Sequence, residues 1–422
     1  MDQFEKKVIE KAVLVGLNAD IFTPEQTASE ASLDELEALL ETAGGVCTAK
    51  VLQNRHTPDP HSFIGEGKVE EVKELLASTE ATLAVFDNDL TPSQNRALEK
   101  LLGVTVLDRS ALILDIFAQR AKTREGRLQV ELAQYKYLLP RLTGMWTHLE
   151  RQEGAMGTRG PGETQLETDR RIIRRRITRL EEELQEVRKV RAVQRERRLK
   201  NSVPVAALVG YTNAGKSTIL NLLTDAGIPA NNRLFDTLDT TTRQLQVSDT
   251  LTVLLSDTVG FISKLPHHLV EAFKATLEEL QYADILIHVI DASDPEREEH
   301  IRVVEKLIAQ LAGEEVPVIS CYNKCDLVEE DDLPRQKDAV WISAKEGTGI
   351  EKLLAKIEEG LNLGKHHVTF LLPYTMGGQV EHLHEKAQVL SCDYDAEGIR
   401  LEAICDGENY GRLRQYIIKE HF

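Results

Sequence analysis

The sequence lacks the features of a membrane or secreted protein. No apolar run approaches the ~18 residues that a bilayer-spanning helix needs. The first ten residues, MDQFEKKVIE, do not show the charged-then-apolar layout of a secretory signal. Five cysteines in 422 residues are too few for a disulfide framework. Cys321 and Cys325 have three residues between them and no second pair, so they do not match a zinc site. These absences predict a protein of the reducing cytoplasm.

Positive charge is also scarce overall, but one segment is basic. The formal net charge is −18, which by itself argues against nucleic acid as a partner. Residues 119–200, however, carry about 21 Lys and Arg against about 12 Asp and Glu, a balance near +9 that leaves about −27 for the rest. An acidic body with one basic arm can repel phosphate in general and still bind it at the arm.

The first part of the chain, residues 1–122, alternates short apolar runs with helical patterns. Strands are predicted at 12–17, 46–52, 83–87 and 104–107, and helices at 32–41, 67–77 and 92–102. Strand and helix in turn, with short connections, predict a small α/β domain with a mainly parallel sheet. No catalytic set of residues is recognisable there.

Residues 123–200 predict an antiparallel helical hairpin. Apolar residues in 128–149 and in 173–187 recur at alternating spacings of four and three, which is typical of two helices that pack together. Pro140 predicts a break in the first helix. Five of the twelve residues in 154–165 are Gly or Pro, so a non-helical tip is expected there.

The second helix of this hairpin is rich in arginine, which forms paired hydrogen bonds with phosphate better than lysine does. Because the excess is of one sign within an acidic protein, we predict an RNA contact. The residues expected to make it are Arg159, Arg170, Arg171, Arg174 and Arg175. The alternative is a solvated or protein-binding arm, since charge runs are usually solvated.

A phosphate-binding loop lies in residues 205–223. The apolar run 205–209 is followed by GYTNAGKS at 210–217 and then by a helical pattern, which is G-x-x-x-x-G-K-[ST] in its strand–loop–helix setting. Glycines let backbone N–H groups approach phosphates closely. Lys216 is expected to reach the β- and γ-phosphates, and the Ser217 hydroxyl is expected to hold Mg²⁺.

Three further motifs follow in order, each after an apolar run. Asp257 in DTVG can reach Mg²⁺ through a bound water, and the Gly260 N–H can contact the γ-phosphate. Asp326 in NKCD can accept hydrogen bonds from guanine N1–H and the 2-amino group, which adenine lacks. The SAK sequence at 343–345 can hold the guanine O6 edge. Because ligands collect at the carboxyl ends of strands in such sheets, the set predicts a GTP site.

Catalysis is expected from Lys216, Thr237 and Gly260, by positioning and charge stabilisation. Thr237 is selected as the switch residue that binds Mg²⁺ when the γ-phosphate is present, about 20 residues past Ser217. The candidates for this role are Thr237, Thr240, Thr241 and Thr242.

Phe261 stands where many GTPases have a glutamine that orients the attacking water. A phenyl ring can neither donate nor accept a hydrogen bond, so slow basal turnover and stimulation by a partner are expected. One hypothesis is that Asn213 in the phosphate loop ligates K⁺, which would supply positive charge at the transition state. The alternative is that Asn213 only bonds within the loop.

Several of these motifs resemble a known family. GYTNAGKST, LFDTLD, DTVGFI, NKCD and SAK are similar to motifs of translation-factor-class GTPases. With FIGEGK, LILDIFAQRA, WTHLERQ and RGPGETQLETDRR they resemble the bacterial HflX family over about residues 10–362. The resemblance implies a GTPase that binds the 50S ribosomal subunit with its 23S rRNA, can split stalled 70S ribosomes and responds to stress.

The nucleotide site that the motifs and the resemblance imply spans five short segments. Its residues are Gly210, Tyr211, Thr212, Asn213, Ala214, Gly215, Lys216, Ser217, Thr218, Phe235, Asp236, Thr237, Leu238, Asp239, Asp257, Thr258, Val259, Gly260, Asn323, Lys324, Asp326, Ser343, Ala344 and Lys345. A cytoplasmic protein that is monomeric when free is expected. The rival functions are assistance to RNA modification or ribosome assembly, and regulation through a protein bound by the coiled coil.

Residues 365–422 predict a small module of order β-α-β-β-α. Strands are expected at 368–372, 389–394 and 399–405, and helices at 374–387 and 409–419. His366, His367, His382 and His384 are expected to be surface residues rather than ligands. The predicted fold class is therefore α/β: an N-terminal α/β domain (1–122), a long helical hairpin (123–200), a Ras-like P-loop domain (201–362) and a small α+β domain (363–422).

Overall fold

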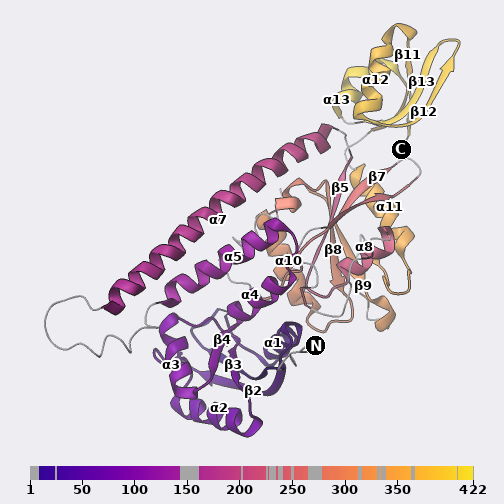
Figure 1. The fold of residues 1–422 in the computed structure, drawn as a ribbon. Coiled ribbons are helices and arrows are strands. Elements are labelled where there is room, and N and C mark those ends of the chain that lie inside the picture. Colours follow the sequence, from indigo (N-terminus) through magenta and orange to yellow (C-terminus); the bar gives the residue numbers. More distant parts are fainter. Residues whose placement is uncertain are drawn as a thin grey trace, which may run out of the picture. The chain divides into compact units, whose positions relative to one another are not determined.

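The computed structural model describes most of the 422-residue chain (Figure 1). The described residues are 9–23, 26–142, 161–200, 203–224, 227, 234–235, 241–248, 251–264, 278–311, 316–329, 333, 339–362, 366–405 and 407–421, with backbone alone at 161–166, 191–200, 278–279, 385 and 407–408. Within these ranges no helix combines the length and apolar character needed to cross a membrane.

The N-terminal sheet is parallel throughout and has the strand order β2-β1-β3-β4. Its strands are β1 (Lys11–Ala19), β2 (Val46–Arg55), β3 (Leu83–Phe86) and β4 (Thr105–Asp108), joined by helices α1 (Glu30–Ala43), α2 (Glu66–Thr79) and α3 (Pro92–Leu102). All four residues of β3 are buried, as expected for an inner parallel strand covered on both faces. The predicted α/β domain is confirmed.

Local sequence explains where these helices begin and end. Ser29 and Thr91 start α1 and α3 with capping boxes, in which side chains satisfy free backbone N–H groups. Gly44 and Gly103 end the same helices with φ of 97° and 74°, values that favour glycine. The helices are therefore fixed in length before they pack on the sheet.

A helical hairpin follows the N-terminal sheet. Helix α4 (Arg109–Arg120) leads into α5 (Arg124–Leu138), a 3₁₀ turn η1 (Leu139–Leu142) contains Pro140, and α7 (Pro161–Lys200) returns antiparallel to α5 (Figure 1). The predicted heptad stripes do meet. Leu128 and Leu132 of α5 pack with Leu180 and Leu184 of α7 in one buried cluster.

One boundary of the hairpin was predicted wrongly. Residues 154–165 were expected to be non-helical, but α7 begins at Pro161. Proline is accepted in the first turn of a helix, because the N–H that it lacks has no partner inside the helix there. Residues 143–160, which include most of the expected tip and the second half of the first predicted helix, lie outside the described ranges.

Asp108 connects the end of β4 to both helices that follow. Its fully buried carboxylate caps α4 through the N–H of Ala111 (2.9 Å), accepts from Tyr137 Oη (2.8 Å), and pairs with Arg141 (2.9 Å). Burial raises the pKa of Asp108, and Arg141 opposes that effect. The base of the hairpin is thereby attached to the sheet through residues on both sides of Pro140.

The central sheet has six strands in the order β10-β9-β8-β5-β7-β6, parallel except for β6. Its elements are β5 (Val205–Gly210), α8 (Lys216–Thr224), β6 (Thr241–Gln246), β7 (Thr252–Asp257), η2 (Glu278–Tyr282), β8 (Ile285–Asp291), α10 (Arg297–Leu311), β9 (Val318–Asn323), η3 (Cys325–Leu327), β10 (Val340–Trp341) and α11 (Ile350–Leu361). Its core is apolar and its inner strands are buried. The predicted Ras-like architecture is confirmed.

The C-terminal sheet is antiparallel, with the order β12-β13-β11-β14. Its elements are β11 (His366–Leu372), η5 (Tyr374–Met376), α12 (Gly377–Lys386), β12 (Gln388–Asp395), β13 (Gly398–Cys405), α13 (Gly407–Leu413), η6 (Arg414–Tyr416) and β14 (Ile417–His421). The final helix predicted at 409–419 is wrong in its second half. Residues 417–421 pair with β11 as an edge strand, and this long-range pairing overrides the local helical pattern.

Contacts divide the chain into two compact units. The first unit contains residues 1–188 together with 231–239 and 262–274, and the second contains the remaining residues. The segment that follows the DTVGF sequence is therefore part of the same unit as the N-terminal sheet, although it lies far from that sheet in the chain. The boundaries of the four predicted domains remain predictions.

Candidate GTP site

The phosphate loop leaves the end of β5 and enters α8, as its sequence predicts. Gly210 has φ of 157°, and a Cβ there would come within 2.2 Å of the Val289 carbonyl oxygen. Gly215 has φ of 98°, and its Cβ would come within 2.1 Å of Asn323 Nδ2. Both positions therefore need glycine, for close approach as well as for conformation.

Lys216 is buried at the start of α8 and binds its own loop. Its Nζ donates to the carbonyl oxygens of Gly210 (3.0 Å) and Tyr211 (2.7 Å). Burial lowers the pKa of Lys216 to about 8, while Asp257 acts in the opposite direction. An anionic ligand beside this ammonium group would favour its charged form, so the site is suited to phosphate.

Ser217 and Asp257 place two oxygens side by side. The Ser217 hydroxyl donates to Asp257 Oδ2 at 2.7 Å, and Asp257 is fully buried at the end of β7. Hydroxyl and carboxylate oxygens are the ligand types that Mg²⁺ prefers. The pair therefore fits a magnesium ion that is bound directly by Ser217 and through water by Asp257.

The DTVG segment is held against the phosphate loop. The Thr212 N–H donates to the Phe261 carbonyl (2.7 Å), and the Phe261 N–H donates to the Gly210 carbonyl (3.1 Å). A Cβ on Gly260 would lie 2.9 Å from Thr212 Cα and 3.1 Å from Lys216 Nζ. Gly260 is thus confined beside the lysine ammonium, where its N–H was expected to contact the γ-phosphate.

The Phe261 ring is 2% exposed, so it packs into the interior. Several other predicted site residues also have buried side chains. The side chains of Tyr211, Ala214, Thr258 and Val259 are at most 7% exposed. Tyr211 stacks on His300 with ring centroids 3.6 Å apart. Thr218 lies in the first turn of α8 and is half-buried.

The expected base-binding motifs meet at one end of the central sheet. Asn323 Nδ2 donates to the Ala214 carbonyl (2.9 Å), and Asn323 Oδ1 accepts from the Ala344 N–H (3.0 Å). Ser343 Oγ donates to Asp326 Oδ1 at 2.6 Å. Asn323 therefore links the phosphate loop to the SAK segment, and Ser343 orients the carboxylate that was expected to read guanine.

The two lysines of these motifs have different environments. Lys324 has φ of 63° and pairs with Asp291 at 2.6 Å, so it fixes the turn after β9. Lys345 is exposed. Asp236, Thr237, Leu238, Asp239 and Arg159 lie outside the described residues. Phe235 is described and buried, and it packs edge-on against Phe117 within the first unit at 4.7 Å between ring centroids.

His288 lies in the middle of β8 and belongs to none of the sequence motifs. It is 3% exposed, and burial lowers its pKa to about 4, with a smaller contribution from Lys216. The neutral imidazole adds no charge beneath the phosphate loop. A histidine inside an apolar strand was the only sequence signal for it.

A second feature missed from the sequence is a buried charge network in the first unit. Arg109 is 1% exposed and donates to Asp87 Oδ1 (2.8 Å), to Glu35 and to the Ser263 carbonyl (3.3 Å). Lys264 donates to the other oxygen of Asp87. Burial lowers the pKa of Lys264, and Asp87 opposes that effect. Ser263 and Lys264 directly follow DTVGFI, so this network attaches that segment to the N-terminal sheet.

Family models match three consecutive parts of the chain. The model described as "GTP-binding GTPase N-terminal" matches residues 30–118, "GTP-binding GTPase Middle Region" matches 120–198, and "50S ribosome-binding GTPase" matches 205–324. A solved GTP-binding protein from Sulfolobus solfataricus, in complex with GDP, is 25% identical with a TM-score of 0.43. The match covers 84% of this chain and 99% of that one.

Curated relatives match over nearly the whole chain. GTPase HflX of Caldanaerobacter subterraneus is 48% identical over 409 residues, which are 97% of this chain and 94% of that protein. GTPase HflX of Alkalihalophilus pseudofirmus is 48% identical over 425 residues and the full length of both chains. GTPase HflX of Escherichia coli is 45% identical over 370 residues, 86% of each chain. The chain therefore belongs to the HflX family of GTPases and is a P-loop enzyme that hydrolyses GTP.

Proposed function

We propose that this GTPase binds the 50S ribosomal subunit through its basic hairpin and splits or rescues stalled 70S ribosomes in the cytoplasm under stress. The observation that carries the proposal is the combination, in one chain, of a guanine-type P-loop site and an arginine-rich helical arm. The match of residues 205–324 to a family described as 50S ribosome-binding supports it.

The nucleotide roles follow from the site residues. Lys216 and the loop N–H groups hold the β- and γ-phosphates, and Gly260 contacts the γ-phosphate through its N–H. Ser217 and Thr237 would hold Mg²⁺ directly, and Asp257 would hold it through water. When bound, the ion would supply positive charge against the phosphate oxygens. The other GTP and GDP contacts are made by the remaining residues of the predicted set, in the P-loop and in FDTLD, NKCD and SAK.

Basal hydrolysis is expected to be slow. The ring of Phe261 is buried, and a phenyl group could not orient a water in any case. The water must then be positioned by another group, which the ribosome would supply or order. A slow enzyme that a partner stimulates behaves as a switch.

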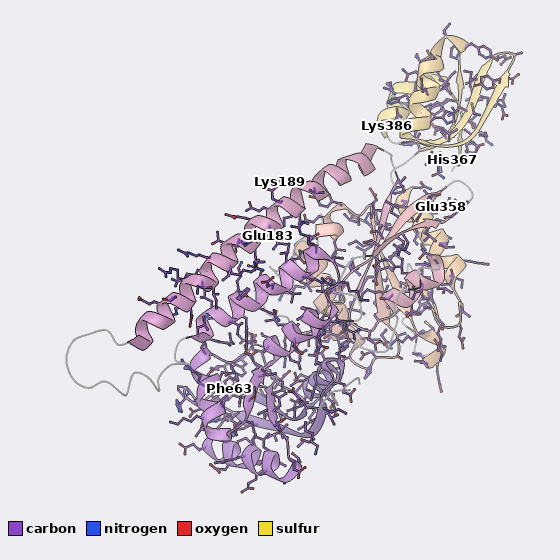
Figure 2. All side chains as sticks on the ribbon, in the orientation of Figure 1. Phe63, Glu183, Lys189, Glu358, His367 and Lys386 are labelled. Carbon is purple, nitrogen blue, oxygen red and sulfur yellow. The ribbon has the colours of Figure 1, made fainter. Side chains whose placement is uncertain are left out.

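The arm has the exposure that an RNA contact needs. Arg171, Arg174 and Arg175 are exposed on α7 and Arg170 is half-exposed, and none of the four forms an ion pair with any described residue. By contrast, Arg176 is engaged with Glu131 of α5 at 2.6 Å, and Arg179 pairs with Glu183 on α7 itself. Figure 2 shows side chains with nitrogen ends projecting from α7 near the labelled Glu183. With Arg159, these four arginines are proposed to contact 23S rRNA.

The direct test is GTP hydrolysis by the monomeric protein with purified ribosomal subunits. We expect 50S subunits to accelerate turnover and 30S subunits to leave it unchanged. Acceleration by free or precursor RNA, but not by mature 50S subunits, would instead favour a role in RNA modification or assembly. No acceleration by any RNA would favour a regulatory GTPase whose coiled coil binds a protein.

Guanine selectivity is predicted to depend on Asp326. Asp326→Asn should weaken GTP binding about 10- to 100-fold, because a charge-assisted hydrogen bond contributes roughly 1.5–3 kcal/mol. The same change should strengthen binding of xanthosine triphosphate, since the amide donates where the carboxylate accepted. Titration of both nucleotides measures this, with the exposed Glu305→Gln on α10 as the matched control. Equal GTP affinity in wild type and Asp326→Asn would refute the assignment.

A role for K⁺ at Asn213 is a separate prediction. Asn213 is exposed and has φ of 62°, so its side chain is available at the outer edge of the phosphate loop. Hydrolysis should be faster in K⁺ than in Na⁺ at equal ionic strength, and Asn213→Ala should remove the difference. Equal rates in the two salts for the wild type would refute a role for K⁺ at Asn213.

A further inference from the structure

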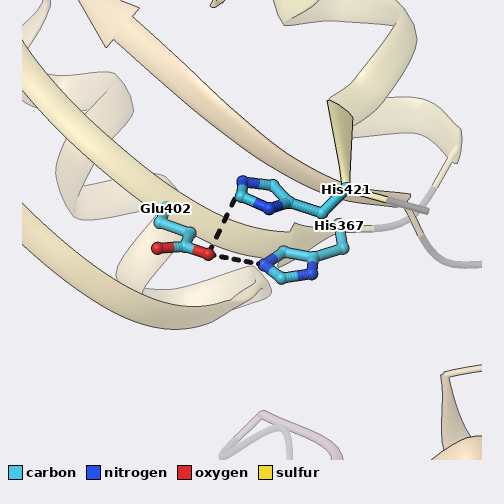
Figure 3. Close-up of side chains that lie close together, drawn as sticks. All are labelled: His367, Glu402 and His421. Carbon is cyan, nitrogen blue, oxygen red and sulfur yellow. Dashed lines mark hydrogen bonds and ion pairs between the residues drawn. The ribbon is translucent and has the colours of Figure 1, made fainter. Parts of the chain in front are cut away.

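Three side chains able to ligate a metal lie together on the C-terminal sheet, in a part of the chain that the GTP chemistry does not use. They are His367 of β11, Glu402 of β13 and His421 of β14 (Figure 3). Their candidate ligand atoms all lie within 4.8 Å of one another, and they form the one such group found among the described residues.

Backbone register brings these residues together. His367 is directly opposite His421 across the β11–β14 ladder, and Thr369 is opposite Glu402 across the β11–β13 ladder. Residues two apart on a strand share a face, so His367 and Thr369 lie on the same side of the sheet. Val368 and Phe370 alternate with them and belong to the buried core. The cluster is therefore held by three hydrogen-bonded strands on the face opposite the core.

The interatomic distances fit a metal with nitrogen and oxygen ligands. Glu402 Oε1 lies 2.8 Å from His367 Nε2 and 3.6 Å from His421 Nε2. In a tetrahedral zinc site with metal–ligand bonds of about 2.0–2.1 Å, neighbouring ligand atoms are roughly 3.2–3.5 Å apart. The two observed distances bracket that range. The imidazole rings are stacked and nearly parallel, with centroids 4.2 Å apart, so one ring must turn for both in-plane Nε2 lone pairs to bind the same ion.

Exposure and charge are compatible with binding. The three side chains are 22–34% exposed, which leaves room for an ion to enter and for water to complete its coordination. The Glu402 carboxylate would offset one of the two charges of a divalent ion. Thr369 Oγ1 lies 2.9 Å from His421 Nε2, a hydrogen bond that metal binding through this nitrogen would replace. The nearby cations do not occupy the site: Lys419, opposite Thr369, is exposed, and Arg400 pairs with Asp395.

We propose that His367, Glu402 and His421 form a binding site for a zinc-like divalent transition metal, with water as the fourth ligand. Two imidazoles and one carboxylate are ligands of the type that Zn²⁺ favours. The metal would link the edge strand β14 to β11 and β13 and so stabilise the pairing of β14 with the sheet. His367 is then a ligand and not the plain surface residue that the sequence suggested.

The competing explanation is an ion-paired cluster in which Glu402 merely accepts hydrogen bonds from the two imidazoles. It predicts no specific metal uptake. The test uses the untagged full-length protein, stripped with a chelator and kept reduced, without nucleotide or Mg²⁺. Equilibrium dialysis with Zn²⁺ counts the bound ions, and Co²⁺ reports the coordination by its visible spectrum.

The double variant His367→Asn/His421→Asn should lose one bound Zn²⁺ per chain and the corresponding Co²⁺ spectrum. Glu402→Gln should weaken binding at least tenfold while leaving the strands intact. The matched control His382→Asn/His384→Asn changes two histidines of α12 outside the cluster and should bind as wild type does. Identical Zn²⁺ stoichiometry and affinity in wild type and in both cluster variants would overturn the proposal.

Hydrogen exchange supplies a readout that does not depend on counting ions. Zn²⁺ should slow exchange of the β14 amides in the wild type and have no such effect in His367→Asn/His421→Asn. Unchanged exchange in the wild type, under conditions where Zn²⁺ is bound, would show that the ion does not hold β14 and would contradict the proposed site.

Discussion

Replacing Arg109 with methionine should destabilise the first unit by about 3–5 kcal/mol, the cost typical of removing one partner from a buried ion pair. Arg109 is 1% exposed and bonds to both Asp87 and Glu35. Methionine keeps much of the volume but removes the guanidinium donors to Glu35 and Asp87, which would keep only the Ser263 hydroxyl and the Ser32 and Lys264 contacts among those described. Denaturant unfolding monitored by hydrogen exchange in β1 and β3 would measure the loss.

Arg96→Met in the same unit is the matched control. Arg96 is half-buried on α3 and its Nε binds the Pro92 carbonyl of its own helix (3.0 Å), so the change should cost well under 1 kcal/mol. If Arg109→Met and Arg96→Met unfold at the same denaturant concentration, the network does not stabilise the unit. Exchange in the 262–264 segment should also rise in Arg109→Met, because Ser263 loses a donor.

Replacing the hairpin tip should abolish the protein's effects on ribosomes but leave basal GTP hydrolysis nearly unchanged. The structure places the start of α7 at Pro161, so the replacement is confined to residues 154–160, exchanged for a Gly/Ser linker of equal length. Basal GTP hydrolysis should stay within about twofold of wild type, because the phosphate loop lies some fifty residues away in the chain. Acceleration by 50S subunits and splitting of 70S particles should both disappear.

A Gly/Ser replacement at 396–397, in the turn between β12 and β13, controls for the introduction of a flexible loop. It should leave both ribosomal activities intact. If the tip-replaced protein splits 70S particles at the wild-type rate, the hairpin is not the element that acts on the ribosome. The contact would then be sought in the C-terminal sheet domain or the switch segments.

Periodicity and local signals sufficed to predict much of the fold. Short apolar runs that alternate with helical patterns predicted every strand of the N-terminal sheet. Such runs are typical of parallel strands, because both faces of the sheet are covered by helices. Heptad spacing identified the pair α5 and α7 because a shared apolar stripe is a local property of each helix. The edge strand β14 was missed because its conformation depends on pairing with β11, about fifty residues earlier in the chain.

The phosphate loop was recognisable because its chemistry depends on residue types at short, fixed spacing. The long-range contacts around the loop could not be predicted in the same way. The link from Asn323 to Ala214 spans 109 residues, and the contact of Lys264 with Asp87 spans 177. The His367–Glu402–His421 cluster likewise requires the register of three strands. No spacing rule connects such positions, because folding alone brings them together.

The most direct test of the account is a sedimentation profile of the purified protein with 70S ribosomes and a non-hydrolysable GTP analogue. We predict that the protein migrates with the 50S subunit, that the 70S peak falls as the 50S and 30S peaks rise, and that GDP gives neither change. A protein that stays at the top of the gradient with the analogue, above an unchanged 70S peak, would contradict it.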